Sequence, residues 1–311
     1  MYVVPLSQLK LKDAKLCGAK AASLAKLYAS HAHVPETFVL TDEARKAFFA
    51  LNQLAPVIQA ELDRLQVEEL HSIDYASRVI EDAILAGTFP SALETELLQQ
   101  YAHTNAASAV VRSSAFAPQG LPDAWGAELR TEINVHVDSL LEAIKRCWAS
   151  AFSARSLYLA ASHHVNLAEI RHSLIVQRMI PALASGLVYT IHPVHRDPNL
   201  LVIEAGLGLG EAIEHGHVIP DTYTLTKEPL KILEKHVVAQ ASRLMPQATG
   251  EGTTVEALDP IETQKLSDRE IFALAQRAID METLFKTPLC LEWAWDDDVY
   301  LLQARDIRPG V

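Results

Sequence analysis

The sequence is poor in cysteine and lacks any long hydrophobic run. Its three cysteines, Cys17, Cys147 and Cys290, lie far apart, which excludes a disulfide framework and a cysteine-based metal motif. No segment approaches the ~18 uninterrupted apolar residues of a membrane-spanning helix. The first fifteen residues contain several lysines and therefore cannot form the apolar core of a signal peptide. These absences predict a cytoplasmic protein with reduced thiols and no membrane association.

Basic charge is also scarce. The chain has 39 acidic and 27 basic residues, and its formal net charge is −12. A nucleic-acid partner is not expected, because binding a phosphate backbone requires clustered lysine and arginine. The apolar share of 49% and the charged share of 21% are ordinary for a globular protein. With 311 residues, the chain is long enough for two domains or one two-lobed domain.

Helical and strand patterns follow one another at irregular intervals, which predicts an α+β fold rather than a doubly wound sheet. Helices are expected at 18–27, 44–101 with a break near Gly87, 139–159 and 268–285, the last capped by Ser267. Strands are expected at 34–40, 109–112, 133–135, 173–179, 187–191, 200–203 and 222–226.

The last part of the chain predicts a β-hairpin, since two apolar, β-prone runs flank the acidic turn 296–298. These runs contain an acid, an amide and a guanidinium: Glu292, Gln303 and Arg305. Convergence of these groups on one sheet face would suit a phosphate chain with its metal. The alternative is an ordinary sheet edge with a solvated polar face.

The register of this hairpin decides between the two interpretations. A four-residue loop that pairs Ala294 with Val299 would place Glu292 beside Leu301. The same register would place Cys290 beside Gln303. We therefore expect Cys290, Glu292, Gln303 and Arg305 to share one face.

Two other segments could bind an anion. Lys20 follows Gly18 in the first turn of a predicted helix, where backbone N–H groups favour negative charge. The alternative is an ordinary surface lysine. Arg112 leaves a buried strand beside Ser113 and Ser114, so an anionic ligand or an internal ion pair must receive its charge.

Three further patterns are less specific. The strand that contains Gln177 and Met179 could lie against a nucleobase or form a sheet edge. The glycine run 206–210 follows a strand but lacks the spacing of a dinucleotide-binding fingerprint. The pairs His192/His195 and His215/His217 have spacings that allow zinc, but no cysteine or carboxylate set completes a tetrahedron, and scattered surface histidines explain them better.

Taken together, the motifs resemble the ATP-binding domain of the phosphoenolpyruvate synthase, pyruvate phosphate dikinase and rifampicin phosphotransferase family. The resemblance covers nearly the whole chain. It is carried in order by 18–24 (Gly-Ala-Lys-Ala-Ala-Ser-Leu), 110–115 (Val-Val-Arg-Ser-Ser-Ala), 121–124 (Leu-Pro-Asp-Ala), 176–179 (Val-Gln-Arg-Met), 208–211 (Gly-Leu-Gly-Glu), 219–223 (Ile-Pro-Asp-Thr-Tyr) and the Glu292-Trp…Leu-Gln-Ala-Arg305 hairpin.

The resemblance implies an ATP-grasp fold, with an N-terminal lobe at 1–180 and a C-terminal lobe at 181–311 that clamp ATP. It implies transfer of a phosphoryl group from ATP to a histidine on a swivelling domain, with release of AMP and phosphate. The implied roles of individual residues are catalysis and phosphate binding by Lys20, Arg112 and Arg305, a lid position for Thr131, adenine binding by Gln177 and Met179, and Mg²⁺ binding by Glu292 and Gln303.

Two departures concern the phosphate side. The family usually has Asp-Ile-Glu where this chain has Cys290-Leu-Glu292, and a thiol is a poor ligand for magnesium. The family's lid segment is altered to 124–128 (Ala-Trp-Gly-Ala-Glu). A non-catalytic nucleotide-binding or regulatory module is therefore the alternative function. No segment resembles the swivelling domain, so the histidine is expected from a partner protein or from missing C-terminal domains.

Overall fold

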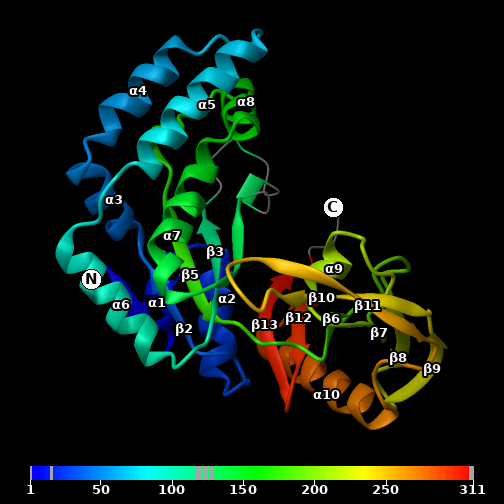
Figure 1. Ribbon diagram of the computed structural model, residues 1–311. Coiled ribbons are helices and arrows are strands. Elements are labelled where there is room, and N and C mark those ends of the chain that lie inside the picture. Colours follow the sequence, from blue (N-terminus) through cyan, green and yellow to red (C-terminus); the bar gives the residue numbers. More distant parts are fainter. Residues whose placement is uncertain (1, 15–16, 117–120, 122–124, 127–128, 308–311) are drawn as a thin grey trace. The chain divides into compact units, whose positions relative to one another are not determined.

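The chain forms two compact units in a computed structural model that describes residues 2–14, 17–116, 121, 125–126 and 129–307 (Figure 1). The first unit contains Met1–Ala22 and Glu36–Met179, and the second contains Ser23–Pro35 and Ile180–Val311. Both units combine helices with antiparallel sheets, which confirms the α+β class. In the part of the chain that the structure describes, no helix is long and apolar enough to cross a membrane.

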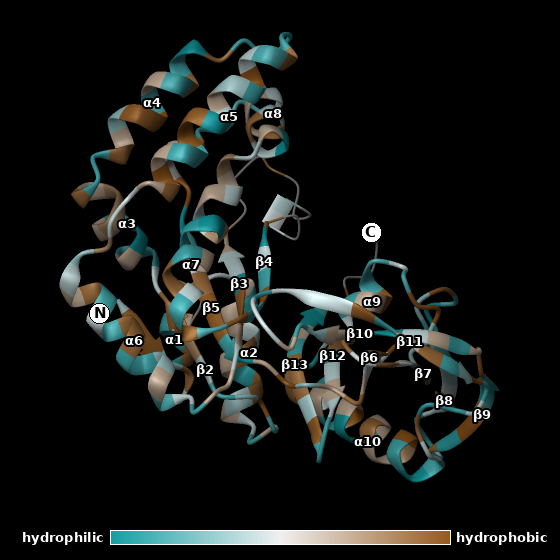
Figure 2. Cartoon of the chain, viewed as in Figure 1, coloured by the Kyte–Doolittle hydropathy of each residue, from teal (hydrophilic) through white to brown (hydrophobic). Residues whose placement is uncertain are grey.

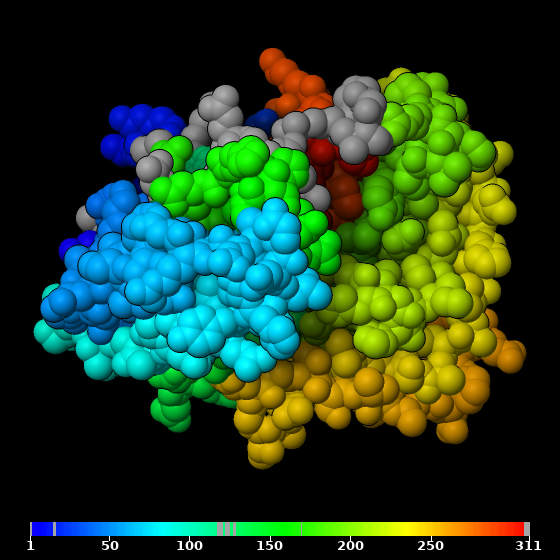
Figure 3. All heavy atoms as spheres, turned by 90° about the horizontal axis from the view of Figure 1, so that it is seen from above, coloured from blue at the N-terminus to red at the C-terminus, as the bar shows by residue number. Residues whose placement is uncertain are grey.

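The first unit is built on a five-stranded antiparallel sheet in the order β1-β2-β5-β3-β4. The strands are β1 (Val3–Pro5), β2 (Thr37–Leu40), β3 (Ala109–Ala115), β4 (Thr131–Val135) and β5 (His172–Arg178). The helices of this region are α1 (Leu11–Ala14), α2 (Ala19–Ala29), α3 (Asp42–Leu51), α4 (Leu54–Arg64), α5 (Leu70–Leu85), α6 (Ser91–His103), α7 (Leu140–Ala149) and α8 (Ala154–Ser162). Helices α4 and α5 lie side by side and form a continuous light-blue and cyan surface in Figure 3.

The two faces of this sheet differ in chemistry. Phe38, Val111 and Val176 lie on one face and pack with helical side chains such as Phe48 and Trp148 in the hydrophobic core. The apolar middle of β5 is brown in Figure 2. The opposite face carries Thr37, Arg112, Ser114, Thr131 and Gln177, and we call it the polar face of the first sheet.

The predicted helix at 139–159 is wrong, because the structure has two helices there. Helix α7 ends at Ala149, a 3-10 turn covers Ser150–Phe152, and α8 begins at Ala154. The Ser153 side chain accepts a hydrogen bond from the Ser156 backbone amide and caps α8. Serine at this position starts a new helix because its hydroxyl satisfies an N–H that has no intrahelical partner.

The second unit contains a six-stranded antiparallel sheet in the order β13-β12-β6-β7-β8-β9. The strands are β6 (Ala184–Tyr189), β7 (Leu200–Leu207), β8 (Asp221–Thr226), β9 (Lys231–His236), β12 (Leu289–Trp295) and β13 (Val299–Asp306). Helix α10 (Asp268–Phe285) packs its buried side chains, including Ile271 and Leu274, near β12 and β7. Its capping box confirms the predicted start, since Ser267 Oγ accepts from the Glu270 amide and the Glu270 carboxylate accepts from the Ser267 amide.

The outer edge of β13 is covered by the N-terminal segment of the same unit. The Leu301 amide donates to the His33 carbonyl oxygen at 2.8 Å. Ser23 Oγ donates to the Ala304 carbonyl oxygen at 2.5 Å. These bonds pair backbone groups that an open sheet edge would expose.

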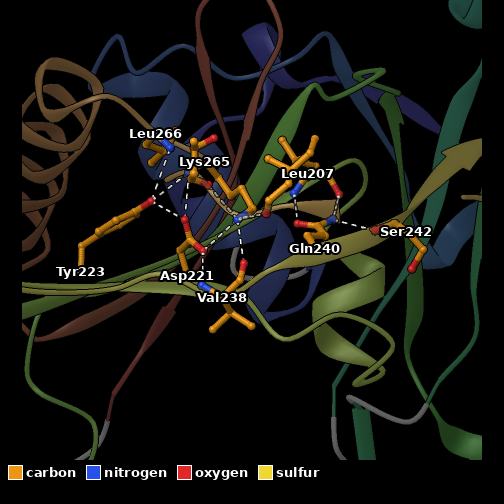
Figure 4. Close-up of polar contacts among 10 residues, drawn as sticks. Leu207, Asp221, Tyr223, Val238, Gln240, Ser242, Lys265 and Leu266 are labelled. Carbon is orange, nitrogen blue, oxygen red and sulfur yellow. Dashed lines mark hydrogen bonds and ion pairs between the residues drawn. The ribbon is translucent and has the colours of Figure 1, made fainter. Parts of the chain in front are cut away.

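A second, two-stranded sheet projects from this unit and was not predicted. Strands β10 (Gln240–Pro246) and β11 (Thr253–Ile261) pair antiparallel, next to the short helix α9 (Glu211–Glu214). An isolated two-stranded hairpin is marginally stable in water, so this one requires anchors. One anchor is the Gln240 amide group, which accepts from the Leu207 N–H at 2.9 Å and donates to the Leu207 carbonyl at 3.0 Å (Figure 4).

The other anchor is a fully buried ion pair at the base of this hairpin. Lys265 Nζ lies 3.1 Å from Asp221 Oδ1, and the side chains are 1% and 0% exposed (Figure 4). The ammonium group also donates to the Val238 and Thr263 carbonyl oxygens at 2.8 and 3.0 Å. The Asp221 carboxylate accepts from the Tyr223 hydroxyl at 2.7 Å and from the Val238 amide at 3.0 Å. The segments just before β10 and just after β11 are therefore both hydrogen-bonded to the ion pair at the start of β8.

Candidate functional site

In the first unit, three of the predicted site residues lie on the polar face of the first sheet. Arg112 on β3 pairs with Ile175 on β5 and with Thr131 on β4. Gln177 lies two residues beyond Ile175, so its side chain points to the same face. The structure thus brings Arg112, Thr131 and Gln177 together.

The start of α2 is fixed to this same face through Ser114. Ser114 Oγ donates to the Cys17 carbonyl oxygen at 2.7 Å and accepts from the Ala21 amide at 3.2 Å. Gly18 permits this contact because its φ is +91° and a Cβ there would lie 2.4 Å from the Ser114 carbonyl oxygen. Lys20 therefore lies in the first turn of α2. This turn is hydrogen-bonded to Ser114, which is two residues from Arg112 along β3.

The charges in this region suit an anion. The N-terminal end of an α-helix carries partial positive charge, and α2 has eleven residues. Lys20 adds a cation in the first turn of α2, and Arg112 adds another on the strand to which this turn is bound. Glu132, the residue after Thr131, lies on the opposite face of β4, where it pairs with Arg130 and with Arg146 at 3.0 Å.

Gln177 and Met179 mark the end of the first unit. Gln177 is 1% exposed, and its Nε2 donates to Thr37 Oγ1 at 3.3 Å. The Met179 amide donates to the Ser108 carbonyl oxygen at 3.0 Å. Any contact of Met179 with a nucleobase must therefore come from its side chain or carbonyl group. Of the altered lid segment, Ala124, Ala127 and Glu128 lie outside the described residues.

In the second unit, the hairpin register differs from the prediction. Trp295 pairs with Val299, so the loop has three residues instead of the four expected. A β-bulge at Leu302 then shifts the strand, and Glu292 pairs with Gln303 while Cys290 pairs with Arg305. Without the extra residue, a three-residue loop would put Glu292 and Gln303 on opposite faces. The bulge restores their common face, which we call the hairpin face.

The hairpin face contains an ion pair between two predicted site residues. Arg305 Nη2 lies 2.7 Å from Glu292 Oε1, and the side chains are 51% and 9% exposed. The Glu292 carboxylate is buried in the sheet, whereas the Arg305 guanidinium reaches solvent and can change its conformation. Gln303 is 1% exposed. Burial raises the pKa of the Cys290 thiol to about 12, and the negative charge of Glu292 adds to this effect.

Sequence analysis missed Glu204 on β7. The register places Glu204 opposite Leu187, and Leu187 opposite Glu292, so the two acids share one face with one residue between them. Burial raises the pKa of the Glu204 carboxyl group. A single acid inside the otherwise apolar strand 200–207 was the available signal.

The donor atoms of the hairpin face fit a magnesium ion only in part. The Glu292 carboxylate and the Gln303 amide oxygen are the hard ligands that magnesium takes, but the Cys290 sulfur is not. Over the described ranges, no group of three or more histidine, cysteine, aspartate or glutamate side chains could hold a metal ion. A metal at this face therefore requires additional oxygen atoms from a ligand or water.

The glycine run 206–210, at the end of β7, does not form a phosphate-binding loop of the dinucleotide-binding type. Its backbone N–H groups are used within the protein: those of Leu207, Gly208 and Leu209 donate to Gln240, Leu183 and Leu244. Gly208, with φ +85°, allows the close approach of Leu244. The Leu207 and Leu209 N–H groups therefore bind the β10–β11 hairpin.

The histidine pairs lie on loops of the second unit. The ring centroids of His192 and His195 are 4.5 Å apart, and those of His215 and His217 are 6.1 Å apart. His192 Nδ1 accepts from the Val194 and His195 amides at 3.3 and 3.2 Å, which fixes the loop. Neither pair is part of a metal-binding group of three among the described residues.

Comparison with known proteins points to one family. The profile of the family described as "Pyruvate phosphate dikinase, AMP/ATP-binding domain" matches residues 14–309. The probable phosphoenolpyruvate synthase of Methanocaldococcus jannaschii is 30% identical over 316 residues, which cover 98% of this chain and 26% of that protein. The probable phosphoenolpyruvate synthase of Archaeoglobus fulgidus is 31% identical, with 99% of this chain and 42% of that protein covered.

Another relative has a different name. The rifampicin phosphotransferase of Bacillus subtilis is 30% identical over 314 residues, which cover 98% of this chain and 36% of that protein. The chain therefore spans about a quarter to two fifths of the length of these three relatives.

Proposed function

Because this chain belongs to the pyruvate phosphate dikinase AMP/ATP-binding domain family, we propose that it is the ATP-binding part of a dikinase-type phosphotransferase. Its two units act as the lobes of an ATP-grasp fold, near the predicted ranges 1–180 and 181–311, and clamp one nucleotide. One phosphoryl group passes from ATP to a histidine of a swivelling domain supplied in trans, one water molecule is consumed in cleaving the second phosphoanhydride bond, and AMP and phosphate are released.

One observation carries this proposal above the others: Arg112, Thr131 and Gln177 share one sheet face to which the first turn of α2 is hydrogen-bonded. The family resemblance predicts these residues from sequence motifs alone, independently of the strand register. Their common face is what binding of a single extended ligand requires. A set of unrelated surface residues would have no reason to converge in this way.

We assign the residues by their chemistry. Lys20 and Arg112 bind the phosphate oxygens, because a first helical turn with two cations stabilises negative charge. Gln177 and Met179 contact the adenine, and Thr131 contacts the phosphates from β4. In phosphoryl transfer the protein mainly orients the reacting groups and neutralises charge on the transferred oxygens.

On the hairpin face, Glu292 and Gln303 would hold magnesium together with nucleotide oxygens and water. Bound magnesium would neutralise phosphate charge and orient the leaving oxygens. Arg305 would leave Glu292 and bind the phosphates, since its exposed guanidinium forms bidentate bonds to such anions.

A second candidate function is a non-catalytic nucleotide-binding or regulatory module. Cys290 favours it, because an acid usually occupies this position in the family and Cys290 supplies no hard oxygen. Such a module would bind ATP and release no AMP. Restoring the acid with Cys290→Asp separates the two candidates, since it should increase turnover only in an enzyme.

Replacing Arg112 by alanine is expected to weaken ATP binding by roughly 10- to 100-fold, the effect of losing a charge-assisted hydrogen bond. AMP binding should change by less than about threefold, because the guanidinium contacts the distal phosphates that AMP lacks. The measurement is calorimetric titration of each nucleotide. Arg64→Ala is the matched control, since it removes one exposed arginine of the same unit.

Equal losses for ATP and AMP would show that Arg112 is structural. A thermal unfolding midpoint recorded for each variant separates loss of binding from loss of folding. No change for either nucleotide would contradict the assignment of the phosphate site to the polar face of the first sheet.

A further inference from the structure

Three different donor groups lie on the hairpin face. From Cys290 to Trp295, β12 pairs with β6 without a register shift, so Cys290 and Glu292 point to the same side. The bulge in β13 brings Gln303 opposite Glu292. A sulfur, a carboxylate and an amide oxygen therefore occupy adjacent positions of one hairpin.

This donor set differs from the all-oxygen set that magnesium prefers. Magnesium requires oxygen ligands in near-octahedral geometry, and only two of the three donors are oxygen. Thiolate ligands select zinc and other thiophilic metals, and carboxylates also bind zinc. The combination of Cys290 with Glu292 thus fits a softer ion better than it fits magnesium.

We propose that the hairpin face binds a thiophilic divalent cation of the zinc class, with Cys290 and Glu292 as protein ligands, in preference to magnesium. This rests on the proposed function, in which ATP oxygens and water complete the coordination. As the metal–sulfur bond forms, the Cys290 S–H bond breaks and its proton passes to solvent. Gln303 is a third ligand through its amide oxygen.

The surroundings of Cys290 allow this metal to enter. Cys290 is partly exposed, whereas Cys17 and Cys147 are 5% and 0% exposed. The Cys147 thiol also lies within hydrogen-bonding distance, 3.6 Å, of the Val111 and Arg130 carbonyl oxygens. Arg305 pairs with Glu292 but is half exposed, so a divalent cation can displace it into solvent.

The first test is titration of the full chain with cadmium chloride, without nucleotide, while the ultraviolet thiolate-to-cadmium charge-transfer band is recorded. The wild-type chain should develop the band with one cadmium per chain. Cys17→Ala should retain it, and Cys290→Ser should lose it. Glu292→Gln should weaken cadmium binding by roughly tenfold, since a charged ligand is lost. No band in the wild type, or an unchanged band in Cys290→Ser, would overturn the proposal.

The second test compares metals in ATP titrations of wild type and Cys290→Asp. The wild type should bind ATP more tightly with zinc than with magnesium, and Cys290→Asp should reverse this order by restoring a hard oxygen. Equal metal preference in both chains would overturn the proposal. A cadmium band without any ATP binding would instead contradict the proposed function and leave the metal ligands assigned.

Discussion

Replacing Asp221 by alanine is expected to destabilise the chain by about 3–5 kcal/mol, the cost of leaving one member of a buried ion pair without its partner. Lys265 would lose its counterion in a site where its side chain is 1% exposed. The carboxylate also accepts hydrogen bonds from Tyr223 and from the Val238 amide, which would lose their acceptor. Since the free energy of unfolding of a protein is only ~5–15 kcal/mol, this substitution would remove a large part of it.

The measurement is urea unfolding followed by circular dichroism, with the free energy of unfolding extrapolated to water. Lys265→Met in the Asp221→Ala background is the informative control, because it removes the unpaired charge and should recover part of the loss. Tyr223→Phe should cost less, about 1–3 kcal/mol, because it removes the hydroxyl that donates to Asp221 and accepts from the Lys265 and Leu266 amides but leaves the ion pair in place. A loss below 1 kcal/mol for Asp221→Ala would contradict the role of this pair as an anchor.

Replacing Glu292 by alanine is expected to abolish the effect of magnesium on ATP binding. Glu292 is the one carboxylate predicted as a metal ligand, and its side chain is 9% exposed. Wild-type affinity for ATP should rise by roughly tenfold or more when magnesium is added, because Glu292 would hold the metal and the metal would neutralise phosphate charge. In Glu292→Ala the two titrations should coincide, while metal-free binding through Lys20 and Arg112 persists.

Glu256→Ala is the matched control for this experiment. It removes one acidic residue of the same unit, and Glu256 pairs with Arg243 on the β10–β11 hairpin. Its magnesium effect should equal that of the wild type. A full magnesium effect in Glu292→Ala would place the metal elsewhere. Cys290→Asp should increase the magnesium effect by adding a hard oxygen ligand.

The sequence predicted the helices and apolar strands well where periodic patterns were strong. Helix α10 begins at its capping box, and α2 and β3 lie close to their predicted ranges. Strands β10 and β11 were missed because few of their residues are buried and burial does not alternate along them. Their stability comes from contacts of Gln240 and Lys265 with residues far away in the sequence, and local patterns do not encode such contacts.

In the β12–β13 hairpin, the sequence predicted the common face of the site residues but not the loop length or the bulge. The predicted common face of Cys290, Glu292, Gln303 and Arg305 is correct, but the loop is one residue shorter than expected. The bulge at Leu302 compensates, and no glycine or other local signal marks it. The family was predicted from motifs and is confirmed by the profile match, whereas the roles of individual residues stay predictions.

Reaction of the full chain with ATP, magnesium and a swivelling-domain protein of the same organism tests the central claim most directly. We expect AMP and phosphate in equal amounts, together with an acid-labile phosphohistidine on the partner. Lys20→Ala and Arg112→Ala should lose both products, because these cations stabilise the transferred phosphoryl group. ATP binding without any AMP, in the wild type and in Cys290→Asp alike, would contradict the account and identify a nucleotide-binding module that lacks the chemistry.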